Sequence, residues 1–251
     1  MALMSVEGWL FLLRWVHFLA GITWIGILYY FNFVQTPFFA ETDAPVRSGA
    51  VQKLVPRALW WFRWSAMFTF LSGWIYLLHW WVGKVGFAAG PGAWAILLGG
   101  LLGSVMWANV WFVIWPNQKI IIQNAIDMAA GKPANPAAGP AGARAGLASR
   151  TNVVFSIPMV FFMGAASHLG TLPIPRSGAL FWIVALIIIA AVEANALAGT
   201  PGKGAAKPLA TVSATLWAGF ILTAVYYIWL DRKSTRLNSS HIQKSRMPSS
   251  A

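Results

Sequence analysis

Three histidines are the residues of this sequence best suited to hold a redox centre. His17, His79 and His168 each lie in or at the end of a long apolar run. Neutral imidazole is a common metal ligand and a frequent axial ligand of haem iron, so histidines in apolar segments favour a b-type haem. Because the 251 residues include no cysteine, the chain itself has no ligands for a c-type haem, an iron–sulfur cluster or a Cys-bound zinc.

The positions of these histidines along their apolar runs favour one pair. Bis-His ligation needs two rings at similar depth on opposite sides of one iron. His79 and His168 lie within about 3 Å of the predicted outer boundary, whereas His17 lies roughly 13 Å below that boundary. The spacing therefore favours His79 with His168, and His17 joins them only if its run is shifted by a turn or two. The alternative for His79 and His168 is a place among interfacial aromatic residues, without a ligand.

Charged side chains inside the apolar runs offer further chemistry. Arg14 precedes His17 by three residues and projects from the same helical face. Its guanidinium suits a haem propionate or an anionic substrate, and the alternative is extension to the interface.

Arg63 and Glu193 lie at matching depths in the inner half, which predicts a buried ion pair, joined by Asn109, Asn152 or Asn195. Such a pair contributes little net stability because desolvation offsets the attraction. A second interpretation makes Glu193 a proton-relay carboxylate.

The elements that position these residues are expected to be transmembrane helices. With 58% hydrophobic and 10% charged residues, the chain is no ordinary soluble domain. A spanning helix needs about 20 mostly apolar residues. Six runs qualify and predict an all-α integral membrane protein with a bundle of about six transmembrane helices, near residues 8–34, 58–81, 93–115, 151–170, 179–199 and 209–230. In the longest connection we expect a short interfacial helix over residues 117–130 and a flexible linker over 132–146.

The Lys and Arg residues between the runs predict the orientation. The first, third and fifth connections hold nine of them, while the N-terminus and the second and fourth connections hold only Lys84 and Arg176. Because cytoplasmic loops are enriched in Lys and Arg, this places both the N-terminus and residue 230 on the periplasmic side of a bacterial inner membrane. The net charge of +12 thus reports topology, and nucleic acid is excluded as a partner.

The last residues differ in character from the rest. Residues 231–251 read DRKSTRLNSSHIQKSRMPSSA, which we interpret as a translated sequencing adapter, expected to be disordered; the alternative is a solvated basic tail. The multi-span membrane domain is then residues 1–230, and the histidine of the tail is left out of every site.

Four segments together resemble a known family. They are RWVHFLAGITWIG (14–26), ALWWFRWSAMFTFLSGW (58–74), WPNQKIII (115–122) and SRTNVVFSIPMVFFMGAASHL (149–169). They are similar to the N-terminal membrane domain of the bacterial membrane-bound, cytochrome-c-linked urate hydroxylases. The first also resembles a wider group of haem-associated membrane proteins that includes the membrane protoporphyrinogen oxidase.

The resemblance implies an oxidoreductase that converts urate to 5-hydroxyisourate and passes electrons to a cytochrome c domain or a respiratory-chain acceptor. The family's histidines correspond to His17 and His168. For urate, an anion at neutral pH, we expect Arg14 to supply charge and Trp24 a stacking surface, with helix packing as the alternative for Trp24. The sequence departs from the family in having no CxxCH, which we attribute to truncation at residue 230.

Two other functions remain open. One is a non-catalytic electron-transfer subunit or membrane anchor that holds haem b. The less favoured is a solute transporter, because the sequence has no inverted repeat.

Overall fold

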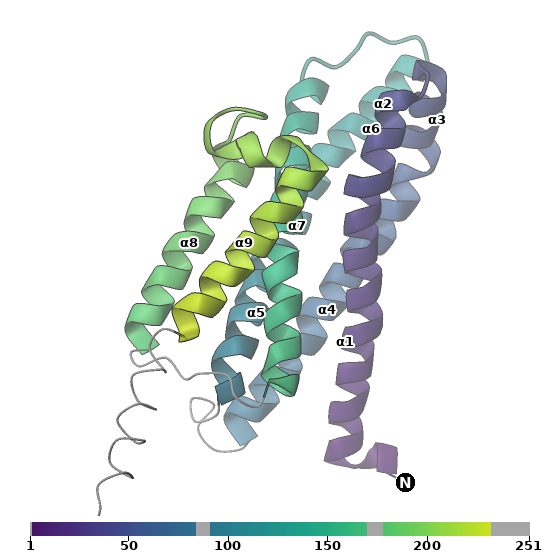
Figure 1. The fold of residues 1–251 in the computed structure, drawn as a ribbon. Coiled ribbons are helices and arrows are strands. Elements are labelled where there is room, and N and C mark those ends of the chain that lie inside the picture. Colours follow the sequence, from purple (N-terminus) through teal and green to yellow (C-terminus); the bar gives the residue numbers. More distant parts are fainter. Residues whose placement is uncertain (1, 84–90, 170–177, 232–251) are drawn as a thin grey trace, which may run out of the picture.

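The computed structural model describes residues 2–83, 91–169 and 178–231, and every regular element in these ranges is a helix (Figure 1). The prediction of an all-α membrane protein is confirmed. The tail from residue 232 and the loop residues Lys84 and Arg176 lie outside the described ranges.

Six long helical segments make up the described bundle; two short elements lie in connections between them, and a third precedes the first segment. Two of the long segments are composite, because a π-helical stretch lies between two α-helices. The long segments are α1 (Val6–Tyr29) with η2 (Tyr30–Gln35) and α2 (Thr36–Glu41), α4 (Val55–Gly83), α5 (Pro91–Ala108) with η3 (Asn109–Ile114) and α6 (Trp115–Ala129), α7 (Ala138–His168), α8 (Gly178–Ala198) and α9 (Val212–Asp231). The short elements are η1 (Ala2–Met4), α3 (Ala44–Lys53) and η4 (Gly204–Ala210).

Five of the six segments are long and apolar enough to cross a membrane. They are the segments that contain α1, α5, α7, α8 and α9, and each matches one predicted span. The sixth, α4, has 29 residues, and its length of about 44 Å suffices for a crossing. Its many tryptophans, with Arg63 and His79, make its most apolar stretch less hydrophobic than those of the other five.

The long segments alternate in direction through the bundle (Figure 1). The connection around α3, the connection between α6 and α7 and the one around η4 lie at one end, while the N-terminus and the end of α9 lie at the other. The three Lys- and Arg-rich connections therefore lie at the same end of the bundle, as their charge predicted. That this end faces the cytoplasm stays a prediction.

The expectations for the longest connection were met only in part, since residues 132–137 form no helix but the rest of the predicted linker is helical. Residues 117–130 form no separate interfacial helix, because α6 continues α5 and η3 without a break from Gly92 to Ala129. The predicted linker is helical from Ala138, the first residue of α7. Alanine has the highest helix propensity, and Pro140 lies in the first turn of α7, where a missing N–H breaks no helical hydrogen bond.

Both π-helical stretches end two residues before a proline. η2 ends at Gln35 before Pro37, and η3 ends at Ile114 before Pro116. A proline inside an α-helix removes one N–H and collides with the carbonyl four residues earlier. The wider π-turn changes the hydrogen-bond register there, so the chain stays helical through the proline.

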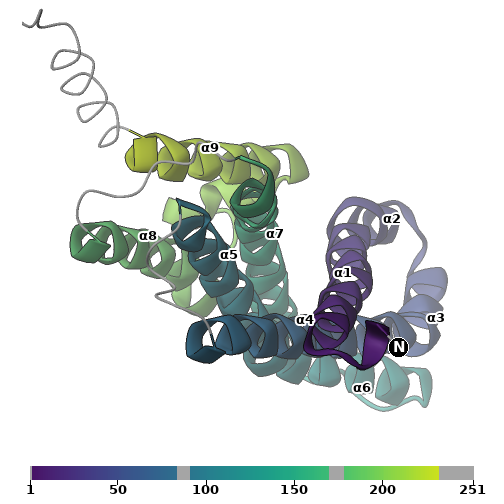
Figure 2. The same cartoon turned by 90° about the horizontal axis from the view of Figure 1, so that it is seen from below.

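Helix α7 lies at the centre of the described bundle (Figure 2) and contacts α5, α6, α8 and α9. Residues 151–156 of α7 are all buried. Helices α1 and α4 form a closely packed pair at one side (Figure 2). This arrangement leaves a space between the α1–α4 pair and the α5–α7 pair, where the first candidate site lies.

Candidate functional site

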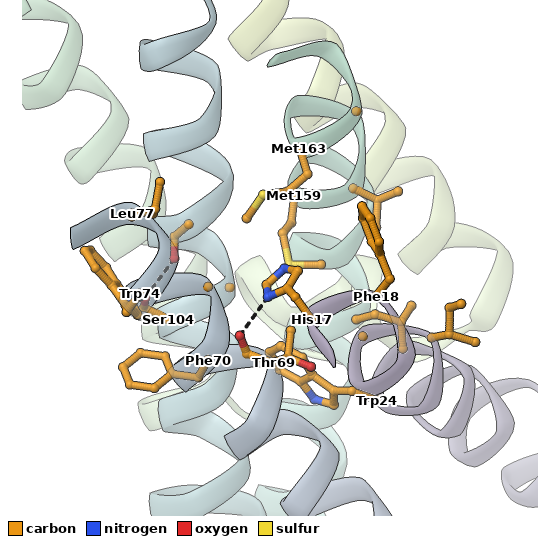
Figure 3. Close-up of a pocket in the computed structure, with 18 of the residues that line it drawn as sticks. His17, Phe18, Trp24, Thr69, Phe70, Trp74, Leu77, Ser104, Met159 and Met163 are labelled. Atoms are coloured by element: carbon orange, nitrogen blue, oxygen red, sulfur yellow. Dashed lines mark hydrogen bonds between the residues drawn. The ribbon is translucent and has the colours of Figure 1, made fainter. Parts of the chain in front are cut away.

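A cavity of about 600 Å³, here cavity 1, lies between α1, α4, α5 and α7 (Figure 3). Its walls are mainly apolar, and each of the four helices contributes glycine or another small residue. They include Gly21, Gly26, Gly73, Gly100, Gly103, Ser104, Gly164 and Ser167. Side chains of this size leave flat helix surfaces, which suits a flat apolar ligand.

His17 is the polar side chain whose orientation in cavity 1 is best defined. Its Nδ1 lies 2.9 Å from the carbonyl oxygen of Thr69 on α4 (Figure 3) and 3.3 Å from Oγ of Ser72. A carbonyl oxygen can only accept a hydrogen bond, and the Ser72 hydroxyl already donates its proton to the Phe68 carbonyl at 2.6 Å. Nδ1 of His17 therefore carries the proton and donates it to the Thr69 carbonyl. The neutral ring therefore has its lone pair on Nε2, the tautomer suited to bind a metal.

Helix packing fixes the ring of His17 as well. A Cβ atom on Gly73 would lie only 2.8 Å from Cε1 and 3.1 Å from Nδ1 of His17. Glycine at residue 73 therefore leaves the room that the imidazole occupies beside α4.

The structure groups the histidines differently from the favoured prediction. His17 and His168 both line cavity 1, and His79 does not. The pair of His79 with His168 was predicted from depth alone, but depth says nothing about which helix face a residue occupies. The thioethers of Met159 and Met163 on α7 also line cavity 1 (Figure 3). In the described residues, no three His, Asp or Glu side chains gather as they would to hold a bare metal ion.

Of the two residues expected to bind urate, one lines cavity 1 and the other does not. Arg14 does not line cavity 1; its guanidinium lies 5.1 Å from the ring centre of Tyr76, a cation–π distance. Trp24 does line cavity 1 and is 1% exposed, and its indole Nε1 is buried without a hydrogen-bond partner in the described structure. The N–H of Trp24 is therefore an unused donor beside cavity 1, although it is not exposed to the cavity itself.

The predicted ion pair of Arg63 with Glu193 is absent. The guanidinium of Arg63 lies 3.5 Å from the ring centre of Trp115 and donates from Nε to the Leu59 carbonyl at 3.3 Å. The one salt bridge within the described residues joins Lys132 to Asp127. The prediction failed because equal depth does not make helices neighbours: α4 packs against α1 and α5, whereas α8 packs against α7.

Glu193 is instead held by the predicted asparagines. Asn109 donates to Glu193 Oε2 at 3.0 Å and to Asn152 Oδ1 at 2.9 Å, and Asn152 donates to the Met106 carbonyl at 3.0 Å. Asn195 is not part of this network and donates to Val192. Asn109 is the first residue of η3, so the π-helical stretch carries the donor that reaches Glu193.

A second cavity of about 600 Å³, here cavity 2, was missed from the sequence. It lies at the end of the bundle with the Lys- and Arg-rich connections, and its lining includes Asn32, Gln35, Arg47, Gln118, Ser149 and Arg150. Asn32 and Gln35 belong to η2. The sequence did offer a signal for this cavity, because an asparagine and a glutamine lie shortly before a proline in a long apolar run. Such a proline can be accommodated by a π-helical turn, and these turns are frequent at functional sites.

The comparisons with known proteins concern the segment from α4 to α9. The family described as "Urate oxidase N-terminal" matches residues 76–226, more than half of the 251 residues. No curated protein and no solved structure matched the chain significantly. The matched segment contains His79, Met159, His168 and Glu193, while His17 precedes it. The chain therefore belongs to the urate oxidase N-terminal family.

Proposed function

We propose that this chain is the membrane domain of a haem-linked urate hydroxylase in a bacterial inner membrane. The reaction adds one oxygen atom from water to urate, gives 5-hydroxyisourate and releases two protons and two electrons. A cytochrome c, in another domain or protein, accepts the electrons. Family membership supports urate as the substrate, and the geometry of His17 in cavity 1 is the observation that supports haem.

The side chains that line cavity 1 are chemically suited to a b-type haem. Nε2 of His17 is left as a lone-pair donor by the hydrogen bond of Nδ1 to Thr69. Three further side chains of the lining can ligate iron: the imidazole of His168 and the thioethers of Met159 and Met163. When bound, a haem supplies a one-electron redox centre between the substrate and the cytochrome.

The residues around His17 keep the site ready for the cofactor. The Thr69 carbonyl fixes the tautomer and the ring plane, and Gly73 leaves space for the ring. On the facing side, Trp74 donates to Ser104 Oγ at 3.0 Å, which ties α4 to α5 (Figure 3). The apolar walls exclude water from the iron, a condition that tunes its potential.

The test is haem binding by the purified protein and two matched variants. We expect a Soret absorption band in the wild type, loss of most of this band in His17→Ala and retention in His79→Ala. The second variant is the control, because His79 is an exposed histidine outside cavity 1. A wild-type protein without a Soret band, or equal bands in both variants, contradicts the haem site.

Addition of urate separates the enzyme from an electron-transfer anchor. With haem bound, urate added without oxygen should reduce the iron and shift the visible bands. A haem that dithionite reduces but urate does not would instead support the anchor.

A further inference from the structure

Cavity 2 is built from residues that are distant in the sequence and meet at one end of the bundle. Its polar walls come from η2, α3, α6 and α7, and the chain around η4 closes one side. Cavity 1 is lined by other residues, since the two linings share no member. Cavity 2 therefore needs an explanation of its own.

The charged groups of cavity 2 are both positive. Arg47 and Arg150 line it, and no Asp or Glu is in its lining. The Nη1 atom of Arg150 donates to the carbonyls of Leu209 and Ala210, the latter at 2.8 Å. Within the described residues, the rest of this guanidinium and the whole guanidinium of Arg47 have no hydrogen-bond or ion-pair partner. Two arginines without a counter-charge favour an anion.

The polar side chains of cavity 2 favour a ligand that carries hydrogen-bonding groups of its own. Oε1 of Gln35 is buried and has no hydrogen-bond partner in the described part of the chain. A buried acceptor without a partner costs free energy, which a ligand N–H or O–H would recover once the Gln35 amide turns toward the cavity. Gln118 and Ser149 lie in the same lining and can each donate or accept.

The aromatic walls and the size of cavity 2 favour an organic ligand. The rings of Phe31, Phe39 and Phe62 line it and provide flat apolar surface. Its volume of about 600 Å³ is far larger than a halide or an inorganic phosphate requires. The ligand that fits combines negative charge, N–H donors, carbonyl acceptors and a flat ring.

We propose that cavity 2 is a binding site for an oxopurine anion, urate in the first place, that enters from the end of the bundle bearing the Lys- and Arg-rich connections. Arg47 and Arg150 bind its negative charge, and Gln118 and Ser149 offer hydrogen bonds to its ring. The identity of the anion rests on the proposed function, but neither the cavity nor its charge depends on haem. The site assigned to urate is thus separate from the haem cavity.

The experiment is equilibrium dialysis of labelled urate against the purified full chain, without added haem, in four forms. Arg47→Gln removes a charge that supports no other part of the fold, and Arg150→Gln removes the second. Arg57→Gln is the control, because it removes an exposed arginine of α4 outside the cavity. We expect urate binding to weaken several-fold in Arg47→Gln, about tenfold or more in Arg150→Gln, and to stay unchanged in the control.

Because Arg150 also holds η4, a second measurement is required. The thermal unfolding of Arg150→Gln shows whether that variant is folded, and Arg47→Gln remains informative if it is not. Equal urate binding in all four forms, or an equal loss in the control, overturns the proposal. So does displacement of urate by inorganic phosphate or anionic lipid vesicles at equal concentration, since these would identify a phosphate or headgroup site.

The outcomes separate this inference from the proposed function. Urate binding that depends on Arg47 and Arg150 in a protein that never binds haem supports cavity 2 and contradicts the haem site. Urate-dependent reduction of a bound haem that neither substitution affects supports the enzyme and places urate elsewhere.

Discussion

The substitution Gly73→Ala tests whether the orientation of His17 determines haem binding. The new Cβ would lie 2.8 Å from Cε1 of His17, inside van der Waals contact. Because Gly73 is within helix α4, the methyl group cannot swing away, so the imidazole has to move by several tenths of an ångström. This movement stretches the 2.9 Å hydrogen bond from Nδ1 to the Thr69 carbonyl.

The effect on stability should be small because two contributions offset each other. Alanine favours a helix interior over glycine by about 1 kcal/mol. Losing the hydrogen bond of Nδ1 costs about 0.5–1.5 kcal/mol. We therefore expect the free energy of unfolding to change by less than about 1 kcal/mol.

The effect on the cofactor should be large. Substitutions that disturb the partner of a metal-bound histidine typically lower metal affinity about 10- to 100-fold. We expect Gly73→Ala to lower haem affinity by this factor and to change the Soret band of whatever haem remains. Haem titration followed by absorbance, together with thermal unfolding of the haem-free protein, measures both effects.

Gly49→Ala is the control. Gly49 lies inside helix α3 and outside cavity 1, and a Cβ on it would meet nothing within 4 Å. Haem affinity should stay close to that of the wild type. Equal haem affinities in the two variants would refute the role of the His17 orientation, and a Gly73→Ala protein that unfolds before haem is added would contradict the small change expected in stability.

Three other experiments test the packing described above. Gly92→Ala should destabilise the protein by about 1–3 kcal/mol in thermal unfolding, because its Cβ would lie 2.5 Å from the backbone oxygen of Ala166. Asn109→Leu should cost about 1–3 kcal/mol by the same measurement, because it leaves Glu193 and a buried amide oxygen without their donor. In a double-mutant cycle of Arg63→Gln and Glu193→Gln, the two effects on unfolding should add within about 0.5 kcal/mol, because the residues form no ion pair.

Different results would contradict each of these expectations. A Gly92→Ala protein as stable as the wild type would mean that α5 and α7 are not in close contact there. Unchanged stability of Asn109→Leu would remove the asparagine network from the core. A coupling above about 1 kcal/mol between Arg63 and Glu193 would restore the ion pair that the structure lacks.

The helices themselves follow from the sequence for a simple physical reason. In the apolar core of a membrane no water satisfies backbone N–H and C=O groups, so a long apolar run has to be helical. Five of the predicted spans have the length and composition of crossing helices. Helix ends were less predictable: the apolar run that starts α1 was expected to end at residue 34 but continues as helix to Glu41.

Which helix faces meet was decided by the tertiary structure alone. His17, His79 and His168 all lie on long helices of the bundle, and the hydrophobic periodicity that marks a buried face in water is nearly absent in a membrane. Depth was therefore the one coordinate that the sequence supplied; it favoured His79 with His168, which do not share a cavity, and the wrong partner for Glu193. Packing around α7 placed His17 with His168 and Glu193 with Asn109.

The cavities, too, were predictable from the sequence only in part. Their glycines, arginines and amides are visible in the sequence, but cavity 1 gathers residues from α1 to α7, and cavity 2 from η2 to the chain around η4. The sequence by itself determined that the chain is a helical membrane protein of the urate oxidase N-terminal family and which polar residues its helices carry. Only the tertiary structure decided which of these share a cavity, because a helix fixes the position of a residue along its axis while neighbouring helices fix what its side chain meets.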